Sequence, residues 1–262
     1  MHIPIGGICH NADSKPMTLS LIGYGEAARA FVDGGLLARA AYDIDATKRD
    51  GIAAHEDAAT ALNGATVVIS LVTADQALRA AESAAQHIVA DALYLDMNSV
   101  APATKRAAAA VIEKAGGRYI DVAIMSPVYP KQMAVPLLVS GPHADAGAAG
   151  LRIAGFADVR TVGDTVGKAS AIKMIRSVMV KGIEALTAEM MQAARAGDVE
   201  AEVLASLGNG WADKVTYNLE RMKSHGMRRA AEMDESAKTL IALGVDPVMT
   251  RGTIIRQRET AA

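Results

Sequence analysis

Residues 18–28 read Thr-Leu-Ser-Leu-Ile-Gly-Tyr-Gly-Glu-Ala-Ala, an apolar run that ends in the pattern Gly-x-Gly-x-x-Ala. The apolar residues of this stretch predict a buried parallel strand. The glycines fall where that strand must turn sharply into a helix, and Ala28 is small enough for the helix to pack closely on the strand. The stretch therefore predicts the first strand, turn and helix of a parallel α/β sheet.

The predicted turn is suited to bind a pyrophosphate. Gly25 has no side chain, so a phosphate can approach the backbone amides at the helix N-terminus, where unpaired N–H groups and the helix dipole favour negative charge. Taken alone, the pattern also occurs in ordinary tight turns between a strand and a helix. We predict that the following residues bind a dinucleotide: Gly23, Tyr24, Gly25, Glu26 and Ala27.

Asp43 strengthens this prediction, because it lies 20 residues after Gly23 at the end of the next predicted strand. At that place a carboxylate can accept hydrogen bonds from the adenosine ribose and repel a 2′-phosphate. The acid therefore favours NAD as the cofactor. Lys48 and Arg49 follow closely and can serve a phosphate, so NADP stays open.

The composition is that of a soluble globular protein with closely packed helices. Its 262 residues suffice for one large or two modest domains, and 51% of them are hydrophobic but only 3% aromatic. The formal net charge of −2 gives no reason to expect binding to nucleic acid or to an acidic membrane surface. No apolar run reaches the length of roughly 18 residues that a membrane span needs.

The N-terminal residues 1–16 lack a clear periodicity and the charged start of a secretory signal. We interpret them as a mobile extension, or as a start site placed too far upstream of Met17. The single cysteine, Cys9, cannot form an internal disulfide, which favours a reducing cytoplasm. Its neighbour His10 is interpreted as incidental, and no metal site is predicted.

The alternation of strand and helix continues after Asp43, which predicts a doubly wound, Rossmann-type α/β domain. Ligands of such sheets bind beyond the carboxyl ends of the strands, so Val72 and Thr73 are expected to line the cofactor groove. Asn98 and Ser99 follow another strand at the same edge. They are candidates for cofactor or substrate contacts, and either can instead cap the following helix. The predicted strands after Asp43 span 51–55 (weak), 66–71, 93–97, 118–124, 137–140 and 159–162.

From Lys168 onward the pattern is helical almost throughout. We therefore place a domain boundary near residue 163, with a dinucleotide-binding domain over 17–163 and an all-α substrate and dimerisation domain over 164–262. The predicted helices span 168–196, 199–207, 209–224, 227–243 and 247–258.

Lys173 is the main candidate for acid–base chemistry, because it is embedded among apolar residues in the first turns of the long predicted helix. A lysine that is partly desolvated and close to another cation has a lowered pKa, which suits proton exchange with an alcohol or carbonyl near neutral pH. Arg176 and Ser177 share its helix face. Arg176 can hold a carboxylate or phosphate, or it can form a salt bridge with Asp164 or Glu184.

The chain after residue 17 resembles the β-hydroxyacid dehydrogenases, the group that includes 6-phosphogluconate and 3-hydroxyisobutyrate dehydrogenases. The run over 224–233, Ser-His-Gly-Met-Arg-Arg-Ala-Ala-Glu-Met, is similar to a subgroup described only as phosphogluconate-dehydrogenase-like. The resemblance implies that Lys173 is the general acid/base and that the helical domain pairs two subunits. The segments that carry it are Gly23-Tyr24-Gly25, Asp43, Asp96 to Pro102, Asp121 to Ser126 and Gly163 to Lys173.

The chain departs from the family at its substrate site. Ser177 stands where the family has asparagine, and Arg176 where it has histidine or asparagine. The substrate-contacting serine of the family falls on Met125, which is followed by Ser126. A late Lys-Asp pair of the family is replaced by Arg228-Arg229. We expect these arginines on a solvated or subunit-bridging helix face. His225, just before them, is a candidate for a second proton carrier. The substrate pocket is therefore predicted to differ from that of the family.

We predict an NAD(P)-dependent oxidoreductase that transfers a hydride between nicotinamide and a small hydroxy-acid-like or carbinol substrate. One alternative is an imine reductase, which the same architecture supports in related families. Another is a regulatory protein that binds a dinucleotide without turnover, which the residues at 125 and 177 favour. The predicted substrate contacts are Asn98, Ser99, Met125, Ser126, Arg176 and Ser177.

Overall fold

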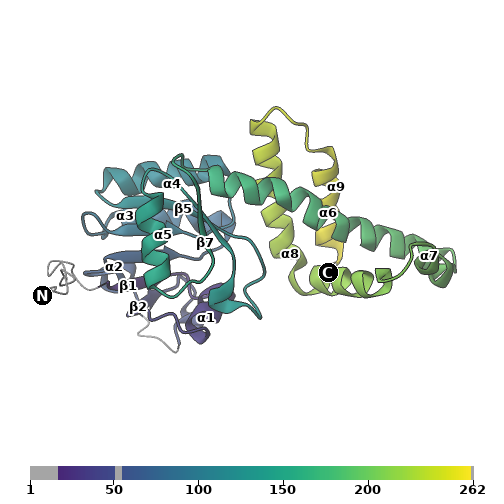
Figure 1. Ribbon diagram of the computed structural model, residues 1–262, viewed down its shortest axis with the longest axis horizontal. Helices are drawn as coiled ribbons and strands as arrows, with labels where there is room; N and C mark the ends of the chain where they lie inside the picture. Colours follow the sequence, from purple (N-terminus) through teal and green to yellow (C-terminus); the bar gives the residue numbers. More distant parts are fainter. Residues whose placement is uncertain (1–16, 51–54, 261–262) are drawn as a thin grey trace, which may run out of the picture.

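The computed structural model describes residues 17–50 and 55–260, which form a sheet-containing part and a helical part (Figure 1). The expected extension over 1–16 lies outside the described residues, as does the weak strand expected over 51–55 except for its last residue.

The predicted Rossmann-type α/β fold is confirmed by a seven-stranded sheet in the order β2-β1-β3-β4-β5-β6-β7. All neighbouring strands are parallel except β5 and β6, which are antiparallel. The chain passes to opposite sides of β1 on its way to β2 and β3, and ligands of doubly wound sheets bind at such a switch point. The strands are β1 (Leu19–Ile22), β2 (Ala40–Tyr42), β3 (Val67–Ser70), β4 (Leu93–Asp96), β5 (Arg118–Ile124), β6 (Leu137–Ser140) and β7 (Val159–Gly163).

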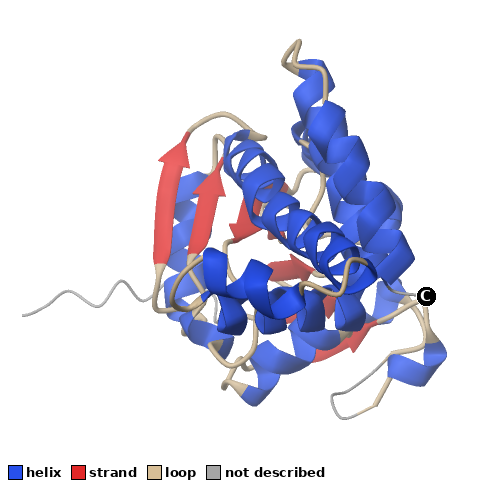
Figure 2. Ribbon diagram, turned by 90° about the vertical axis from the view of Figure 1, so that its right-hand side faces the viewer, coloured by secondary structure: helices blue, strands red, loops and turns tan. Residues whose placement is uncertain are grey.

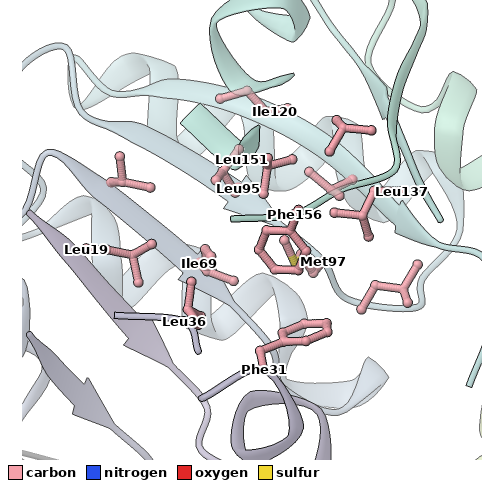
Figure 3. Packing of buried hydrophobic residues seen from close by; sticks show 14 of the residues in the cluster. Leu19, Phe31, Leu36, Ile69, Leu95, Met97, Ile120, Leu137, Leu151 and Phe156 are labelled. Atoms are coloured by element: carbon pink, nitrogen blue, oxygen red, sulfur yellow. The ribbon is translucent and has the colours of Figure 1, made fainter. Parts of the chain in front are cut away.

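Helices cover both faces of the sheet (Figure 2). The larger core cluster contains apolar residues of the central strands together with Phe31 and Phe156, whose rings meet edge to face at 5.0 Å (Figure 3). On the other face, alanines of α3 and α4 contact the sheet, which accounts for the alanine-rich, aromatic-poor composition. The helices of this part are α1 (Glu26–Asp33), α2 (Ala58–Leu62), α3 (Ala77–Ala85), α4 (Pro102–Lys114) and α5 (Ala144–Ile153).

The helical part begins with α6 (Lys168–Ala196), whose bounds agree with the predicted helix. Its first turns lie against the sheet, and the helix then runs out along α8 and α9 (Figure 1). Within the described residues, no helix is both long and apolar enough to span a bilayer. The other helices are α7 (Glu200–Ser206), α8 (Trp211–Ala242) and α9 (Val248–Thr260).

The prediction of two separate helices over 209–224 and 227–243 is wrong, because the structure has the single helix α8 there. Gly226 is buried where α8 packs on its neighbours. An interior glycine costs about 1 kcal/mol relative to alanine, and the packing of this long helix against α6 and α9 outweighs that cost.

Candidate active site

The turn after β1 has the backbone geometry that the glycine pattern predicts. Gly23 has a φ of +89°, and a Cβ atom added to it would lie 2.2 Å from the carbonyl oxygen of Leu71. Its amide donates a 2.8 Å hydrogen bond to the carbonyl of Tyr42, which joins the turn to β2. Only glycine fits this position, because any side chain would enter the backbone that follows β3.

The N-terminus of α1 fits a dinucleotide pyrophosphate. Gly25 is the residue that precedes the helix, and no side chain caps it. A Cβ atom built on Gly25 would meet no other atom within 4 Å, so the backbone is open on that side. The first amides of the helix therefore remain available to an anion, as expected for Glu26 and Ala27.

Asp43 connects the glycine-rich turn to the end of β2. Its Oδ2 accepts a 2.7 Å hydrogen bond from the amide of Tyr24, and its Oδ1 accepts one of 2.9 Å from the amide of Asp45. Each oxygen keeps a further lone pair for a ribose hydroxyl. Of the two cations considered for a 2′-phosphate, Lys48 forms an ion pair with Asp45, and Arg49 donates to the backbone carbonyl of Asp43.

The side chain of Asn98 links the ends of β3 and β4. Its Oδ1 accepts a 2.6 Å hydrogen bond from the amide of Val72, and its Nδ2 donates one of 3.0 Å to the hydroxyl of Ser70. Asn98 is buried. It therefore fixes the backbone at Val72, and Thr73, the next residue, precedes a short 3₁₀ turn.

Lys173 and Ser99 form a contact next to Asn98. The Nζ atom of Lys173 donates a 2.6 Å hydrogen bond to the Oγ of Ser99, across 74 residues of sequence. Ser99 comes from the loop after β4, and Lys173 from the second turn of α6. The two residues predicted separately from the sequence thus form one contact at the carboxyl edge of the sheet.

Burial lowers the pKa of Lys173 from its ordinary value of 10.5 to about 8. The carboxylate of Glu232 opposes this change, and the nearby cations of Lys181, Lys105 and Arg228 add to it. An amine with this pKa is present in both protonation states near neutral pH, as a general acid/base requires.

Of the other residues expected around the substrate, Met125 and Ser126 lie in the loop after β5, and Arg176 and Ser177 lie on α6. Arg176 donates a 3.0 Å hydrogen bond to the carbonyl of Met125, so its guanidinium lies at this loop. The side chain of Met125 packs partly against a small apolar cluster under α6. Ser126 donates to the carbonyl of Pro127, and Ser177 is buried.

Of the two acids considered as salt-bridge partners of Arg176, Glu184 is bound to another residue. It forms a buried ion pair with Arg229 and also accepts a 3.1 Å hydrogen bond from Gln257. The expectation that Arg229 lies on a solvated or subunit-bridging face is therefore wrong, because α6, α8 and α9 bury it between them. Its neighbour Arg228 is half exposed and has a different role.

Arg228 joins the helical part to the glycine-rich turn. Its guanidinium lies 2.7 Å from a carboxylate oxygen of Glu26, the first residue of α1. Glu232, one helical turn further along α8, accepts a 2.5 Å hydrogen bond from Lys181. Burial alone would raise the pKa of Glu232, but the cations of Lys181 and Lys173 lower it to about 2. The charged groups of Lys181, Arg228 and Glu232 therefore act on Lys173 from α6 and α8.

The prediction of candidate residues missed a buried group beneath the site. Lys105 is fully buried between Asp96 and Asp121, which lie in neighbouring apolar strands. One signal for it exists in the sequence, because Lys105 occupies the same helix face as the buried Ala108 and Ile112. A charged residue in an apolar stripe indicates a buried ionic partner.

Two segments of the chain match known families. Residues 17–150 match the family described as the NAD binding domain of 6-phosphogluconate dehydrogenase. Residues 193–260 match a domain of unknown function (DUF1932).

Solved structures share the fold of this chain. A conserved hypothetical protein from Sinorhizobium meliloti is 36% identical, with a TM-score of 0.72 over 94% of this chain and 88% of that one. The 3-hydroxyisobutyrate dehydrogenase of Mycobacterium tuberculosis, solved with L-serine, shares the fold at 17% identity, with a TM-score of 0.73 over 94% of each chain. An imine reductase of Streptomyces aurantiacus shares it at 20% identity, with a TM-score of 0.55 over 93% of this chain and 94% of that one.

Proposed function

The chain belongs to the β-hydroxyacid dehydrogenase superfamily and is an NAD(P)-binding oxidoreductase, and from this premise we propose that Lys173 is the general acid/base of a dehydrogenase acting on a CH–OH group. The observation that carries the proposal is the hydrogen bond between Lys173 and Ser99, beside the dinucleotide turn. Both groups can exchange a proton, which supports a position for the substrate oxygen beside them.

In the direction of oxidation, the neutral amine of Lys173 accepts the proton of the substrate hydroxyl. In the direction of reduction, the ammonium returns a proton to the carbonyl oxygen. When bound, the nicotinamide ring supplies the acceptor or donor of the hydride. Ser99 holds the Nζ atom in place, and its own hydroxyl proton can bind the substrate oxygen.

The proposed substrate is a small hydroxy acid or a related carbinol. Arg176 supports a substrate that carries a carboxylate, because a guanidinium can bind a carboxylate with two hydrogen bonds. Its guanidinium lies at the carbonyl of Met125, one turn along α6 from Lys173. Met125 occupies the position of the family serine, which supports a site that differs from that of 3-hydroxyisobutyrate dehydrogenases.

Imine reduction is the second candidate. It is supported by the shared fold of the imine reductase. A reductase of imines would act on amine-forming substrates and would depend weakly on Lys173. A protein that binds a dinucleotide without turnover would transfer no hydride from any substrate.

We propose NAD as the preferred dinucleotide, with Asp43 as the residue that selects it. Asp43 is fixed by two backbone amides, and a rigid carboxylate at this place repels a 2′-phosphate. Lys48 and Arg49 are engaged with Asp45 and with backbone carbonyls.

We further propose that residues 17–163 hold the dinucleotide and that residues 164–262 complete the substrate site and pair two subunits. An exposed apolar stripe on α6 supports the pairing, because such a stripe on a helix indicates an interface. Its members recur every three or four residues, and they are Ile172, Ile175, Met179, Ile183 and Leu186.

The experiment is a screen of the purified protein against 3-hydroxy acids, carbinols and imines with NAD and NADP, followed at the absorbance of the reduced nicotinamide. Lys173→Ala is expected to lower turnover at least about 100-fold while cofactor binding survives. Lys168→Ala is the matched control, because Lys168 is exposed at the start of the same helix. Turnover that is indifferent to Lys173 would contradict the mechanism.

A further inference from the structure

Lys105 carries a charge at a place that no solvent reaches. Its side chain is 0% exposed, on the face of α4 that packs on the sheet. The Nζ atom donates hydrogen bonds of 2.9 Å to Oδ1 of Asp96 and 2.6 Å to the main-chain carbonyl of Asp96. It also lies 3.4 Å from Oδ1 of Asp121. One ammonium group therefore joins the carboxylates of two neighbouring strands, β4 and β5.

Asp121 continues this link to α6. Its Oδ2 accepts hydrogen bonds of 3.1 Å from the amides of Gly167 and Ser170, and one of 3.2 Å from the hydroxyl of Ser170. These two amides are among the first N–H groups of α6. Such groups have no hydrogen-bond partner within the helix itself. Lys173 follows Ser170 by three residues, so Asp121 fixes the first turn of α6, directly before the turn that carries Lys173.

Asp96 continues the link in the other direction. Its Oδ1 accepts a 2.9 Å hydrogen bond from the amide of Asn98, and its Oδ2 accepts one of 2.6 Å from the hydroxyl of Tyr119. Ser99 follows Asn98 directly. The loop that carries Ser99 is therefore fixed by the same buried network that fixes the first turn of α6.

On the basis of the proposed function, we propose that Lys105 is a positioning residue, which holds Asp96 and Asp121 together and thereby sets the distance between Lys173 Nζ and Ser99 Oγ. Stability alone does not call for this arrangement, because apolar residues of similar volume replace buried ionic groups without loss in many proteins. An apolar residue, however, offers no directional bond to the two loops.

The charges that act on Lys173 come from three helices. Lys105 lies on α4, Lys181 on α6, and Glu232 and Arg228 on α8. The cation of Lys105 lowers the pKa of Lys173, so its removal raises that pKa. This change can be measured without a substrate.

The test compares wild type with Lys105→Met and with the double variant Lys105→Met/Asp121→Asn. The single variant leaves two buried carboxylates without a cation and is expected to be less stable. The double variant keeps the formal charge of the cluster at −1, because one cation and one anion are removed together. Its asparagine still offers an oxygen to the first turn of α6. The double variant is therefore expected to fold even where the single variant does not.

Three quantities are measured in each variant: kcat, the Kd for NAD, and the pH titration of the Lys173 amine by NMR of ¹⁵N-labelled lysine. We expect kcat to fall about 10- to 100-fold in both variants, as for a reacting group displaced by about 1 Å. The Kd for NAD should stay within about threefold in both variants, and the Lys173 midpoint should rise in Lys105→Met. Arg229→Met is the control, because it breaks a buried ion pair of α6 far from Lys173 and should change stability alone.

A kcat and a Lys173 titration equal to those of wild type would overturn the proposal. So would a double variant whose kcat returns together with its stability, since that would give Lys105 a merely structural role. The proposed function fails by a different result, namely turnover that survives in Lys173→Ala. The titration of Lys173 in the Lys105 variants distinguishes the two failures, because it requires no turnover.

Discussion

The Nζ atom of Lys173 and the Oγ atom of Ser99 lie 2.6 Å apart at the carboxyl edge of the sheet. Each comes from a different part of the chain, Lys173 from α6 and Ser99 from the loop after β4. The contact lies next to Asn98, whose side chain accepts a hydrogen bond from the amide of Val72 in the loop after β3. Substrate oxygen, proton carrier and dinucleotide can therefore meet at one place.

The first prediction concerns Ser99. In Ser99→Ala the amine of Lys173 loses the group that orients it, so kcat is expected to fall about 10- to 100-fold. The KM for NAD should change little, since Ser99 contacts neither Asp43 nor the glycine-rich turn. Steady-state kinetics in which NAD is varied at saturating substrate measure both values. Ser99→Thr keeps the hydroxyl and should retain most of the activity; equal losses in the two variants would argue against the hydrogen bond.

The second prediction is the pH dependence of turnover. Oxidation needs the neutral amine of Lys173, so kcat/KM should rise with pH and level off above about 8, the pKa of Lys173. Reduction needs the ammonium, so its rate should be level below about 8 and fall above it.

Two neighbouring residues should move this midpoint in opposite directions. The carboxylate of Glu232 raises the pKa of Lys173, so Glu232→Gln should shift the midpoint to lower pH. The cation of Lys181 lowers it, so Lys181→Met should shift the midpoint to higher pH. Rate profiles from pH 6 to 10 would show the shifts. A midpoint that stays fixed in both variants would mean that another group titrates.

The sequence predicts the outline of this molecule because local signals agree with the packing. The long helix α6 has its predicted bounds, since Gly167 and Gly197 flank an uninterrupted helical pattern. The first strand and its turn follow directly from the apolar run and from Gly23. The same reasoning fails at Gly226, where the buried position within a packed helix outweighs local propensity.

The candidate site is predictable as a set of residues but not as a set of contacts. Lys173 stands out in the sequence, whereas its partner Ser99 is 74 residues away and no local pattern joins them. Asn98 was expected to contact ligand or cap a helix, and the structure uses its side chain to join β3 and β4. Lys105 was missed, because its two carboxylate partners lie on strands whose pairing only the fold defines.

The third prediction concerns the choice of cofactor. Asp43→Asn keeps an oxygen for the amide of Tyr24 but removes the negative charge at the ribose. The Kd for NAD is expected to rise about 10-fold, because hydrogen bonds to charged groups are the stronger ones. The Kd for NADP should fall, since the repulsion of its 2′-phosphate is lost. Calorimetry with both nucleotides measures the ratio of the two Kd values. Asp91→Asn is the control, because Asp91 is an exposed acid in the turn before β4.

The fourth prediction concerns assembly. The side chain of Met179 is 68% exposed at the centre of the apolar stripe on α6, and a buried carboxylate there would have no partner. Met179→Glu is therefore expected to convert a dimer into a monomer, as measured by light scattering after gel filtration. Leu37→Glu places the same charge on an exposed apolar residue outside the helical part and should leave the mass unchanged. A wild type that is monomeric at all concentrations would contradict the proposed pairing.

The last prediction concerns the ion pair between Arg229 and Glu184, which joins α8 to α6 in the interior of the helical part. Arg229→Met leaves the carboxylate of Glu184 buried without its cation, so the free energy of unfolding should fall by about 3–5 kcal/mol. Glu184→Met/Arg229→Met removes both charges and should recover much of that loss, because no uncompensated charge remains.

Arg195→Met is the control for this pair, since Arg195 pairs with Glu200 at the surface and such pairs contribute about 1 kcal/mol or less. Urea unfolding at one fixed protein concentration compares all four proteins, because pairing of subunits makes stability depend on concentration. If the double variant is as unstable as Arg229→Met, the loss comes from packing of the arginine side chain and its contacts, and the charge of Glu184 is not the cause.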